Sequence, residues 1–347
     1  MIITYLRSSS YGQHEMCNMA YYIEYGLGWR QPSNKAAERG TIVHKLLEVL
    51  GHIKLAEQNG VKQFQDDIVG RVRLSNYDII KMTEKIYDYY ASHSPNEWEA
   101  KDLKECHRLT NIAITYKDGA FDPRNNDIEA VEKKFDIDIQ QPWAVYNYDN
   151  GLKGFLSLKG TIDQIVRINN NTLEIVDWKT GARKNWATGE QYTWDSLQKN
   201  HQLLMYYYCA KRLYPKVDSI ITTIFYIKDG GPFTMCFSDA DIPRIENMLQ
   251  DKFEEIKNTK IPRLNRSWKC TKLCHYGKST FEDTSILPIV EKRNGQVCKR
   301  GSCMTKCEQI RYCLEHRDME SVNKNMSAPN HNVDFYQAPG EIQEEQK

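Results

Sequence analysis

Two short runs of β-forming residues, joined by three asparagines, constrain this chain more than any other feature. The runs are 160–168 and 172–179, and the asparagines between them indicate a hairpin turn because asparagine tolerates left-handed backbone angles. Each run carries an aspartate, Asp163 in the first and Asp177 in the second. If the three asparagines form the loop, Asp163 lies directly opposite Asp177. Both carboxylates then project from one face of the sheet.

Such a pair of carboxylates indicates a cation. Two carboxylates about 5 Å apart repel each other by about 3 kcal/mol at an effective dielectric constant near 20. Mg²⁺ or Mn²⁺ suits them, because a hard cation prefers oxygen ligands and keeps waters for chemistry. Lys179 would lie beside the metal and could offset the charge of a scissile phosphate or help to deprotonate the attacking water. The shared face of the two aspartates depends on the hairpin register, because a loop of two or four residues would place them on opposite faces.

The acidic-x-Lys triplet alone is not distinctive. It also begins at Glu99, Asp102, Glu132 and Glu255. Only the triplet that begins at Asp177 lies on a strand paired with another aspartate-bearing strand. Glu132, on the strand before the hairpin, could reach the site, but we interpret it as a solvated charge and leave it outside the predicted set.

The pattern along the chain predicts an α/β protein. Helices are expected at 36–50, 78–91, 195–213 and 241–257, and strands at 130–139, 160–168, 172–179, 219–226 and 234–237. The expected parts are an N-terminal helical part of the core (1–50), a helical insertion (51–125), a catalytic sheet with helices (126–260), a cysteine-rich segment (261–317) and a disordered tail (318–347). The last is predicted from its polar, aperiodic composition.

The composition narrows the class of protein. The chain has 347 residues, 40% of them hydrophobic, enough for one large domain or two modest ones. A formal net charge of +1 excludes a strongly basic protein overall, although a locally basic cleft beside acidic metal ligands remains compatible with it. No run of 18 apolar residues predicts a membrane span, and the first ten residues lack a leader pattern. We therefore expect a cytoplasmic protein with no membrane partner.

Three motifs, in this order, make the chain resemble the RecB-like branch of the PD-(D/E)XK nuclease superfamily. The first is the stretch 39–48, which contains His44; the second is the pair Gly-Thr-Ile-Asp and Asp-Trp-Lys-Thr-Gly of the hairpin; the third is the Q-x-x-x-Y pattern at 202–206. Ile162 replaces the proline of the family's name. The resemblance covers roughly residues 1–230. It implies a restriction-endonuclease-like core with a small mixed central sheet flanked by helices, a helical insertion and a cysteine-rich C-terminal cap.

The resemblance also assigns roles. The implied metal ligands are His44, Asp163, Asp177 and the backbone carbonyl of Trp178. Lys179 becomes the catalytic lysine. Gln202 and Tyr206 would contact DNA or order the site, and their spacing places them on one face of a helix. Taken singly, His44 could instead be a structural histidine, and Gln202 and Tyr206 could simply pack their helix.

Six of the ten cysteines fall between Cys270 and Cys313, which indicates metal or iron–sulfur ligation rather than a disulfide framework. The segment 268–276 resembles the cysteine-bearing end of iron–sulfur nucleases in the same branch, where one early and three late cysteines hold a [4Fe–4S] cluster. The ligands implied by this resemblance are Cys17, Cys270, Cys274 and Cys307, with Cys303 and Cys313 as substitutes because the late spacing departs from the family's. A zinc ion, or no metal at all, remains an alternative.

These patterns together predict a Mg²⁺- or Mn²⁺-dependent DNA exonuclease of recombination, repair or replication, acting on ends or single strands. Trp186, Tyr192 and Trp194 could stack on bases or merely pack their loop. The alternatives are a non-catalytic DNA-binding or assembly subunit, and a structure-specific endonuclease. No phosphate-loop motif is present, so any helicase partner would be a separate chain. The short layout suits a bacterial or phage enzyme.

Overall fold

The computed structural model describes residues 3–147, 151–185, 188–229, 231–279, 290–291, 297–298, 304–317 and 320. They belong to two units. The terminal unit takes the described residues of Met1–Ile3, Ser9–Pro32 and Lys252–Lys347, and the sheet unit takes those of Thr4–Ser8 and Ser33–Asp251. Segments from both ends of the chain therefore contribute to one unit.

The described elements follow the chain in this order. The α-helices are α1 (Ser8–Met16), α2 (Asn18–Tyr21), α3 (Lys35–Gln58), α4 (Ile79–His93), α5 (Ala100–Thr115), α6 (Trp194–Leu197), α7 (His201–Leu213), α8 (Ile242–Asn258), α9 (Trp268–Lys272) and α10 (Lys306–Glu315). The strands are β1 (Tyr5–Leu6), β2 (Gln63–Asp66), β3 (Gly70–Arg73), β4 (Ile128–Asp138), β5 (Val145–Asn147), β6 (Lys153–Phe155), β7 (Ser157–Asn169), β8 (Thr172–Lys179), β9 (Ser219–Tyr226), β10 (Gly231–Cys236), β11 (Val290–Glu291) and β12 (Val297–Cys298).

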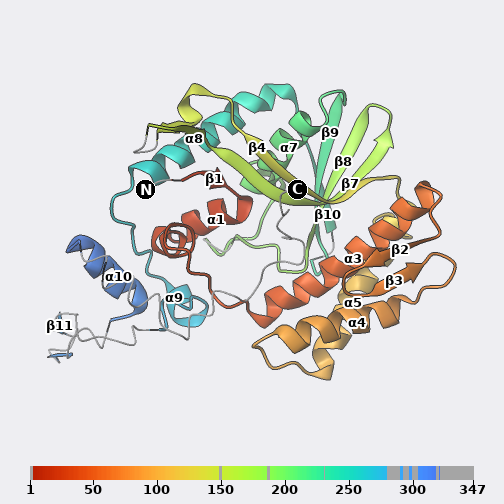
Figure 1. Ribbon diagram of the computed structural model, residues 1–347, viewed down its shortest axis with the longest axis horizontal. Coiled ribbons are helices and arrows are strands. Elements are labelled where there is room, and N and C mark those ends of the chain that lie inside the picture. The colour runs from red at the N-terminus through yellow and green to blue at the C-terminus, as the bar shows by residue number, and fades with distance from the viewer. Residues whose placement is uncertain are drawn as a thin grey trace. The chain divides into compact units, whose positions relative to one another are not determined.

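A mixed sheet is the centre of the sheet unit, and six strands of the described chain form it (Figure 1). β7 runs antiparallel to β4 and β8 and parallel to β1. β8 runs parallel to β9, and β10 closes the sheet antiparallel to β9. Helices α3 and α7 both contact the sheet. The predicted α/β class, with a small mixed central sheet flanked by helices, is confirmed.

The β7–β8 turn differs from the predicted loop. It has two residues rather than three, because Asn169 pairs with Thr172. A β-bulge at Ile168 then adds one residue to β7 and returns the rest of the hairpin to the predicted register. Without the bulge, the two-residue loop would have placed the two aspartates on opposite faces of the sheet. The predicted shared face is therefore correct, but the loop that was expected to produce it is not.

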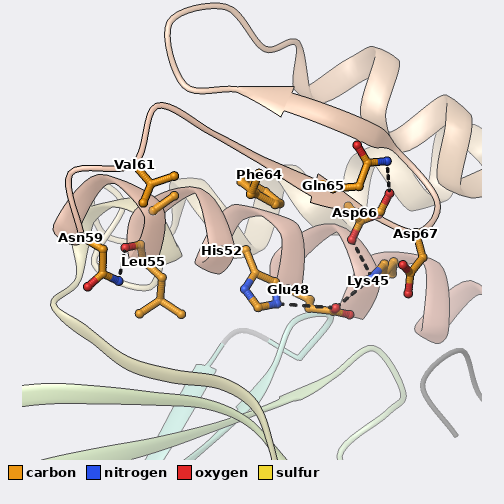
Figure 2. A pocket seen from close by; sticks show the side chains of 11 residues that line it. Lys45, Glu48, His52, Leu55, Asn59, Val61, Phe64, Gln65, Asp66 and Asp67 are labelled. Carbon is orange, nitrogen blue, oxygen red and sulfur yellow. Dashed lines mark hydrogen bonds and ion pairs between the residues drawn. The ribbon is translucent and has the colours of Figure 1, made fainter. Parts of the chain in front are cut away.

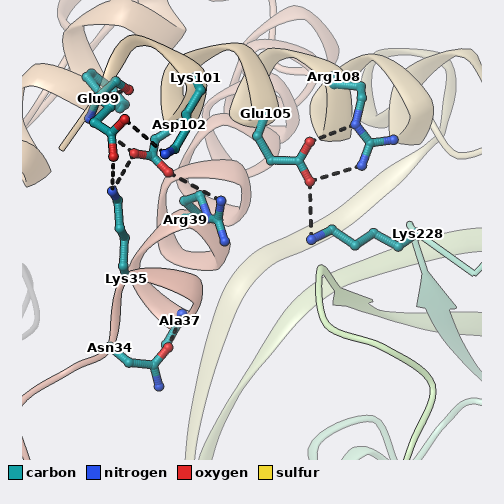
Figure 3. A network of polar contacts seen from close by, with 11 residues as sticks. Asn34, Lys35, Ala37, Arg39, Glu99, Lys101, Asp102, Glu105, Arg108 and Lys228 are labelled. Atoms are coloured by element: carbon teal, nitrogen blue, oxygen red, sulfur yellow. Dashed lines mark hydrogen bonds and ion pairs between the residues drawn. The ribbon is translucent and has the colours of Figure 1, made fainter.

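Helix α3 is held by its neighbour α5 at its first turns (Figure 3). Lys35 Nζ lies 2.6 Å and Arg39 Nη1 3.3 Å from the buried carboxylate of Asp102 on α5. One turn later on α5, Glu105 pairs with Lys228, which follows β9, at 3.2 Å. Helix α5 thus links the start of α3 to the end of β9, two places that border the candidate site.

The stretch 51–125 contains α4, close to the helix expected at 78–91, and a further helix, α5. It also contains the short β2–β3 hairpin, which the pattern did not indicate. Figure 1 shows these elements beside α3. The predicted helix 195–213 is divided into α6 and α7. Asn200 causes the division, because its side chain accepts hydrogen bonds from the backbone N–H groups of Gln202 and Leu203 at 2.9 and 3.3 Å and so begins a new helix. The predicted domain boundaries remain predictions.

The terminal unit has an apolar cluster of its own. It joins α2 and the following π-helical turn η1 (Tyr22–Gly26) with Tyr276 and α10. Ile23, Tyr276 and Ile310 are nearly or fully buried there. Of the predicted tail 318–347, only residue 320 is described. Among the described helices, none is both long and apolar enough to cross a membrane.

Candidate active site

β8 separates from β7 near its C-terminal end, and the predicted catalytic residues lie at this fork. The last backbone pair of the hairpin joins Gln164 and Val176. Beyond it, residues 159–163 of β7 pair with neither β1 nor β8 among the described residues. The Trp178 N–H accordingly donates to the Asp163 carboxylate at 2.9 Å rather than to a backbone carbonyl. The fork therefore fixes the orientation of Asp163.

Helix α3 brings His44 to the fork. The distance from His44 Nδ1 to Asp163 Oδ2 is 3.4 Å, and the two side chains are 27% and 14% exposed. Gly40, one turn earlier, allows this approach, because a Cβ there would lie 2.7 Å from Thr180 Oγ1 at the end of β8. The glycine in this motif thus has a packing reason, and the histidine beside it faces the first aspartate.

We expect Gly40→Ala to lower the rate of any reaction at this site by roughly 10-fold. The added methyl group presses on Thr180 and displaces α3 with His44, and a misplacement of about 1 Å can cost up to about 100-fold in rate. Thr180→Ala removes the opposing atom, so the double variant should recover most of the rate. Single-turnover assays of the three variants check this. A fully active Gly40→Ala would show that α3 does not need the gap.

The second aspartate anchors a chain of polar contacts. Asp177 is 1% exposed, and its Oδ2 lies 2.5 Å from Lys179 Nζ. Its Oδ1 accepts a hydrogen bond from Gln202 Nε2 on α7 at 2.9 Å. Gln202 also contacts the hydroxyl of Tyr206 at 3.0 Å, and that hydroxyl donates to the Thr161 carbonyl on the open edge of β7 at 2.9 Å. The Q-x-x-x-Y pair therefore orders the fork from one face of α7.

The charges at the fork oppose one another. Burial raises the pKa of the Asp177 carboxyl, and the Asp163 charge adds to that rise although Lys179 opposes it. Burial alone would lower the pKa of Lys179, but the carboxylates of Asp177 and Asp163 outweigh it and the net pKa is raised. Lys179 thus stays protonated and neutralises Asp177. Because one ammonium faces two aspartates, the site favours a further cation.

Glu132 is a further candidate site residue, which the sequence analysis left out. It is half-buried, and the pairs on either side of it in the β4–β7 ladder place it opposite Asp163. Burial first, and then the charges of Asp163 and Glu48, raise its pKa to about 8. Its φ of +46° is rare for a residue other than glycine and persists only where the surroundings impose it. The sequence feature that could have indicated this role is the position of Glu132 on the strand that precedes the hairpin.

We expect the metal-free protein to bind Mn²⁺ more tightly as the pH rises from about 7 to about 9. Glu132, with a pKa of about 8, loses its proton in that range and adds a negative charge beside Asp163. Glu132→Gln should remove most of this dependence, whereas Glu129→Gln, on the same strand and paired with Arg167, should keep it. Calorimetric titrations at the two pH values measure the effect. If Mn²⁺ affinity changes with pH equally in all three proteins, Glu132 lies outside the metal site.

The same raised pKa affects stability. Because the folded pKa of Glu132 lies above its ordinary value of 4.5, its contribution is present below about pH 4.5 and is lost as the pH rises through about 8. In the metal-free state, Glu132→Gln should therefore become progressively more stable than the natural protein over this window.

A pocket of about 430 Å³ lies between α3 and the β2 region (Figure 2). Lys45, next to His44 in sequence, lies 2.8 Å from Glu48 and 2.9 Å from the buried Asp66 at the end of β2. Figure 2 shows these three side chains joined across the pocket, with His52 on the far side of Glu48. Lys45 holds the Glu48 carboxylate in place, and the charge of this carboxylate helps to raise the pKa of Glu132.

The four cysteines predicted as cluster ligands line one cavity in the terminal unit. This cavity also measures about 430 Å³ and is lined by Cys17, Cys270, Cys274 and Cys307 among others. They come from the turn between α1 and α2, from α9, from the loop after α9 and from α10. The cavity thus gathers one early and three late cysteines, although most of the chain separates them in sequence.

The thiols in this cavity interact with one another. The hydrogen bond from Cys307, together with the backbone N–H groups of Gly277 and Tyr276, lowers the pKa of Cys274 to about 6, although burial opposes the change. The same hydrogen bond, with burial and the nearby thiols of Cys17 and Cys270, raises the pKa of Cys307. Thiolates are the form that binds metal. A cavity that stabilises one thiolate and groups three further thiols around it fits a metal group with thiolate ligands.

The structure describes only some of the remaining predicted site residues. Cys313 packs in the apolar cluster of the terminal unit, and Cys303 and Trp186 lie outside the described residues. The Trp178 side chain is buried against Phe225, at a ring separation of 5.5 Å, and its carbonyl as a metal ligand stays a prediction. As the side chains stand, no three His, Cys, Asp or Glu of the described chain form a complete metal site. A metal would therefore require small side-chain adjustments, such as release of Lys179 from Asp177.

The mixed sheet brings two aspartates and a lysine together at a strand fork, and the helix with the Q-x-x-x-Y pattern orders them. This combination points to the class of nucleases. The chain belongs to the PD-(D/E)XK nuclease superfamily, whose family model matches residues 8–279. Nucleases of this superfamily usually use Mg²⁺ or Mn²⁺. The match spans most of the described chain, including the fork, α7 and the first late cysteines.

The chain is also similar to particular proteins. It is 23% identical over 168 residues to a subunit of the ATP-dependent helicase/deoxyribonuclease of Streptococcus agalactiae, in strains of serotypes Ia and V. That match covers 47% of this chain but only 13% of the relative's length. Among solved structures, a "putative exonuclease" from Eubacterium rectale aligns with 11% identity and a TM-score of 0.42, over 78% of this chain and 86% of that one.

Proposed function

We propose that this nuclease is a divalent-metal-dependent deoxyribonuclease that digests DNA from an end. The observation that carries the proposal is the fork, where Asp163 and Asp177 share one face and Lys179 lies against the second. Every motif position holds a chemically competent side chain, which favours catalysis over a purely structural role. DNA is proposed as the substrate because the S. agalactiae relative is named as part of a deoxyribonuclease.

Each site residue has its own proposed role in hydrolysis. His44, Asp163 and Asp177 would hold Mg²⁺ or Mn²⁺ after Lys179 turns from Asp177 to the substrate, and Glu132 extends this set. The cation would polarise the scissile phosphate and lower the pKa of the attacking water. The Lys179 ammonium then balances negative charge that develops on the phosphate oxygens. Gln202 and Tyr206 keep Asp177 and the open edge of β7 in place, which limits the reorganisation needed during the reaction.

We also propose that Cys17, Cys270, Cys274 and Cys307 hold a [4Fe–4S] cluster with a structural role. One cavity with four thiols and two N–H donors supports this. The cluster would supply cross-links between segments far apart in sequence, while hydrolysis needs only the fork. Zinc is the alternative for the same ligands. Metal analysis of the purified protein separates the two, since iron with acid-labile sulfide indicates a cluster and zinc alone excludes one.

The setting is proposed from the same features. Thiols of this number stay reduced in a cytoplasm, so we place the protein in a bacterial or phage-infected cell. The name of the S. agalactiae relative joins a helicase to a deoxyribonuclease. A separate helicase is therefore a candidate partner, and recombination or repair of DNA ends a candidate process.

End-labelled single- and double-stranded DNA, incubated with Mg²⁺, Mn²⁺ or EDTA, tests the proposal. We expect metal-dependent release of short products from an end, lost in Asp177→Asn. Closed circular DNA is the control for end dependence. Its cleavage at the same rate would indicate an endonuclease instead. Binding without hydrolysis in any metal would overturn the catalytic proposal and favour an assembly role.

A further inference from the structure

Aromatic rings continue outward from the catalytic lysine across neighbouring strands. Lys179 on β8 pairs with Tyr226 on β9, and Tyr226 pairs with Gly231 on β10. Phe233 is two residues further along β10, so its side chain lies on the same face of the sheet as those of Lys179 and Tyr226. The Tyr226 and Phe233 rings are 6.1 Å apart, edge to face. An aromatic row therefore begins directly beside the fork.

Tyr192 in the loop after β8 and Trp194, the first residue of α6, add to this row. Tyr192 lies 6.4 Å from the Tyr226 ring at an angle of 30°, and Trp194 lies 5.2 Å from the Phe233 ring. The Arg183 guanidinium stands over the same Phe233 ring, 4.7 Å from its centre. Arg183 is held there by its backbone N–H, which donates to the Asp229 carboxylate at 2.5 Å, and by its side chain, which donates to the Tyr192 carbonyl.

Trp194 is the exposed end of the row. Its side chain is 52% exposed, whereas Tyr226, next to the lysine, is 4% exposed. An indole that packs on Phe233 at an angle of 59° and is half exposed leaves ring surface in water that a further planar group can cover. The contact with Phe233 accounts for only part of the Trp194 side chain, and the rest is exposed to water.

We infer that Trp194, supported by Phe233 and Arg183, is a stacking site for unpaired bases of single-stranded DNA. We call it the Trp194 platform. The inference rests on the proposed nuclease function, since continuity with Lys179 is what selects a nucleic acid as the occupant. A strand whose phosphate lies at the fork passes along the same sheet face, and its neighbouring bases meet the rings. Duplex DNA keeps its bases stacked on one another, so only a frayed or single strand can use the platform.

The chemistry matches this occupant. Aromatic side chains beside a phosphate-binding groove stack on bases of any sequence, each stack contributing roughly 1–3 kcal/mol, and a guanidinium over a ring adds a cation near the backbone. The platform would therefore select for strandedness and not for sequence. It would favour ends that a helicase has already opened.

The test measures affinity without hydrolysis. Fluorescence anisotropy in EDTA compares a labelled oligothymidine strand with the same strand lacking bases, for the natural protein, Trp194→Ala, Trp194→Phe and Phe155→Ala. Phe155, an exposed ring on β6 outside the row, is the matched control. We expect Trp194→Ala to bind the ordinary strand about 10-fold more weakly and the base-free strand as well as the natural protein does. Trp194→Phe and Phe155→Ala should stay within about 3-fold of it.

Two results would overturn the platform. One is unchanged affinity of Trp194→Ala for the ordinary strand, and the other is an equal loss for both strands, which would assign the residue to phosphate contacts. Failure of the nuclease proposal looks different. In that case the natural protein binds the strand but does not hydrolyse it with Mn²⁺, whatever residue occupies position 194.

Discussion

Asp163→Asn is expected to abolish metal-dependent hydrolysis, with kcat lower by about 1000-fold or more. The change keeps the size of the side chain and an oxygen for the Trp178 N–H. It removes the charge that faces His44 at 3.4 Å. A carboxylate that holds a catalytic cation contributes several kcal/mol to the transition state, and preorganised groups of this kind commonly account for about 100- to 1000-fold each. Single-turnover assays with Mn²⁺ measure the loss.

The same variant should not be less stable without metal. The Asp163 charge helps to raise the pKa of both Asp177 and Glu132, so its removal relieves repulsion in the metal-free site. Thermal unfolding should show equal or higher stability in EDTA and no further stabilisation by Mn²⁺. Asp136→Asn is the matched control, because Asp136 is 58% exposed on β4 and pairs with Lys159. Asp163→Asn with activity within about 10-fold of the natural protein would exclude Asp163 as a ligand.

Cys274→Ala is expected to remove most of the iron and to unfold the terminal unit at temperatures where the natural protein is folded. Metal-binding free energy is folding free energy where segments distant in sequence supply the ligands. Cys274 contributes the thiolate that Cys307, Gly277 and Tyr276 stabilise. Iron analysis, visible absorbance and limited proteolysis measure the effect.

The controls separate ligands from other cysteines. Cys236→Ser, at an exposed position on β10, should keep the full iron content. Cys313→Ser tests the substitute ligand, and we expect iron to remain while stability falls, because Cys313 is 1% exposed in the apolar cluster. If Cys274→Ala retains iron and Cys313→Ser loses it, the ligand set is wrong. If no variant contains metal, the cavity is a plain thiol cluster.

Much of the site could be predicted because local sequence determines it. The alternation of β7 and β8 places Asp163 and Asp177 on one face, and the helical spacing of Gln202 and Tyr206 places both on one face of α7. The convergence of four cysteines on one cavity was predicted by resemblance rather than by spacing. In each case, residues close in sequence or joined by a family motif carried enough information.

What escaped prediction depends on tertiary contacts. The bulge at Ile168 is a correction to the ladder that follows from neither turn chemistry nor alternation. Glu132 was interpreted as solvated because a strand pattern does not show that Asp163 and Glu48 surround it with negative charge. The division of the expected helix depended on whether Asn200 would cap a new helix or stay inside a continuous one. The role of Gly40 depends on Thr180, far away in sequence.

The terminal unit is assembled from segments that lie far apart in sequence, and this sets the order in which its parts are made during synthesis. Cys307 leaves the ribosome roughly 15 to 60 s after Cys17 at about 5–20 residues per second. The strands and helices of the sheet unit, including the fork, are made in that interval. The segment that carries Cys17 must wait for its packing partners until α10 has emerged. Chains truncated before α10 and, with the proposed cluster, chains made under iron starvation would therefore share one defect, a segment around Cys17 without its packing partners, which proteases and chaperones can recognise.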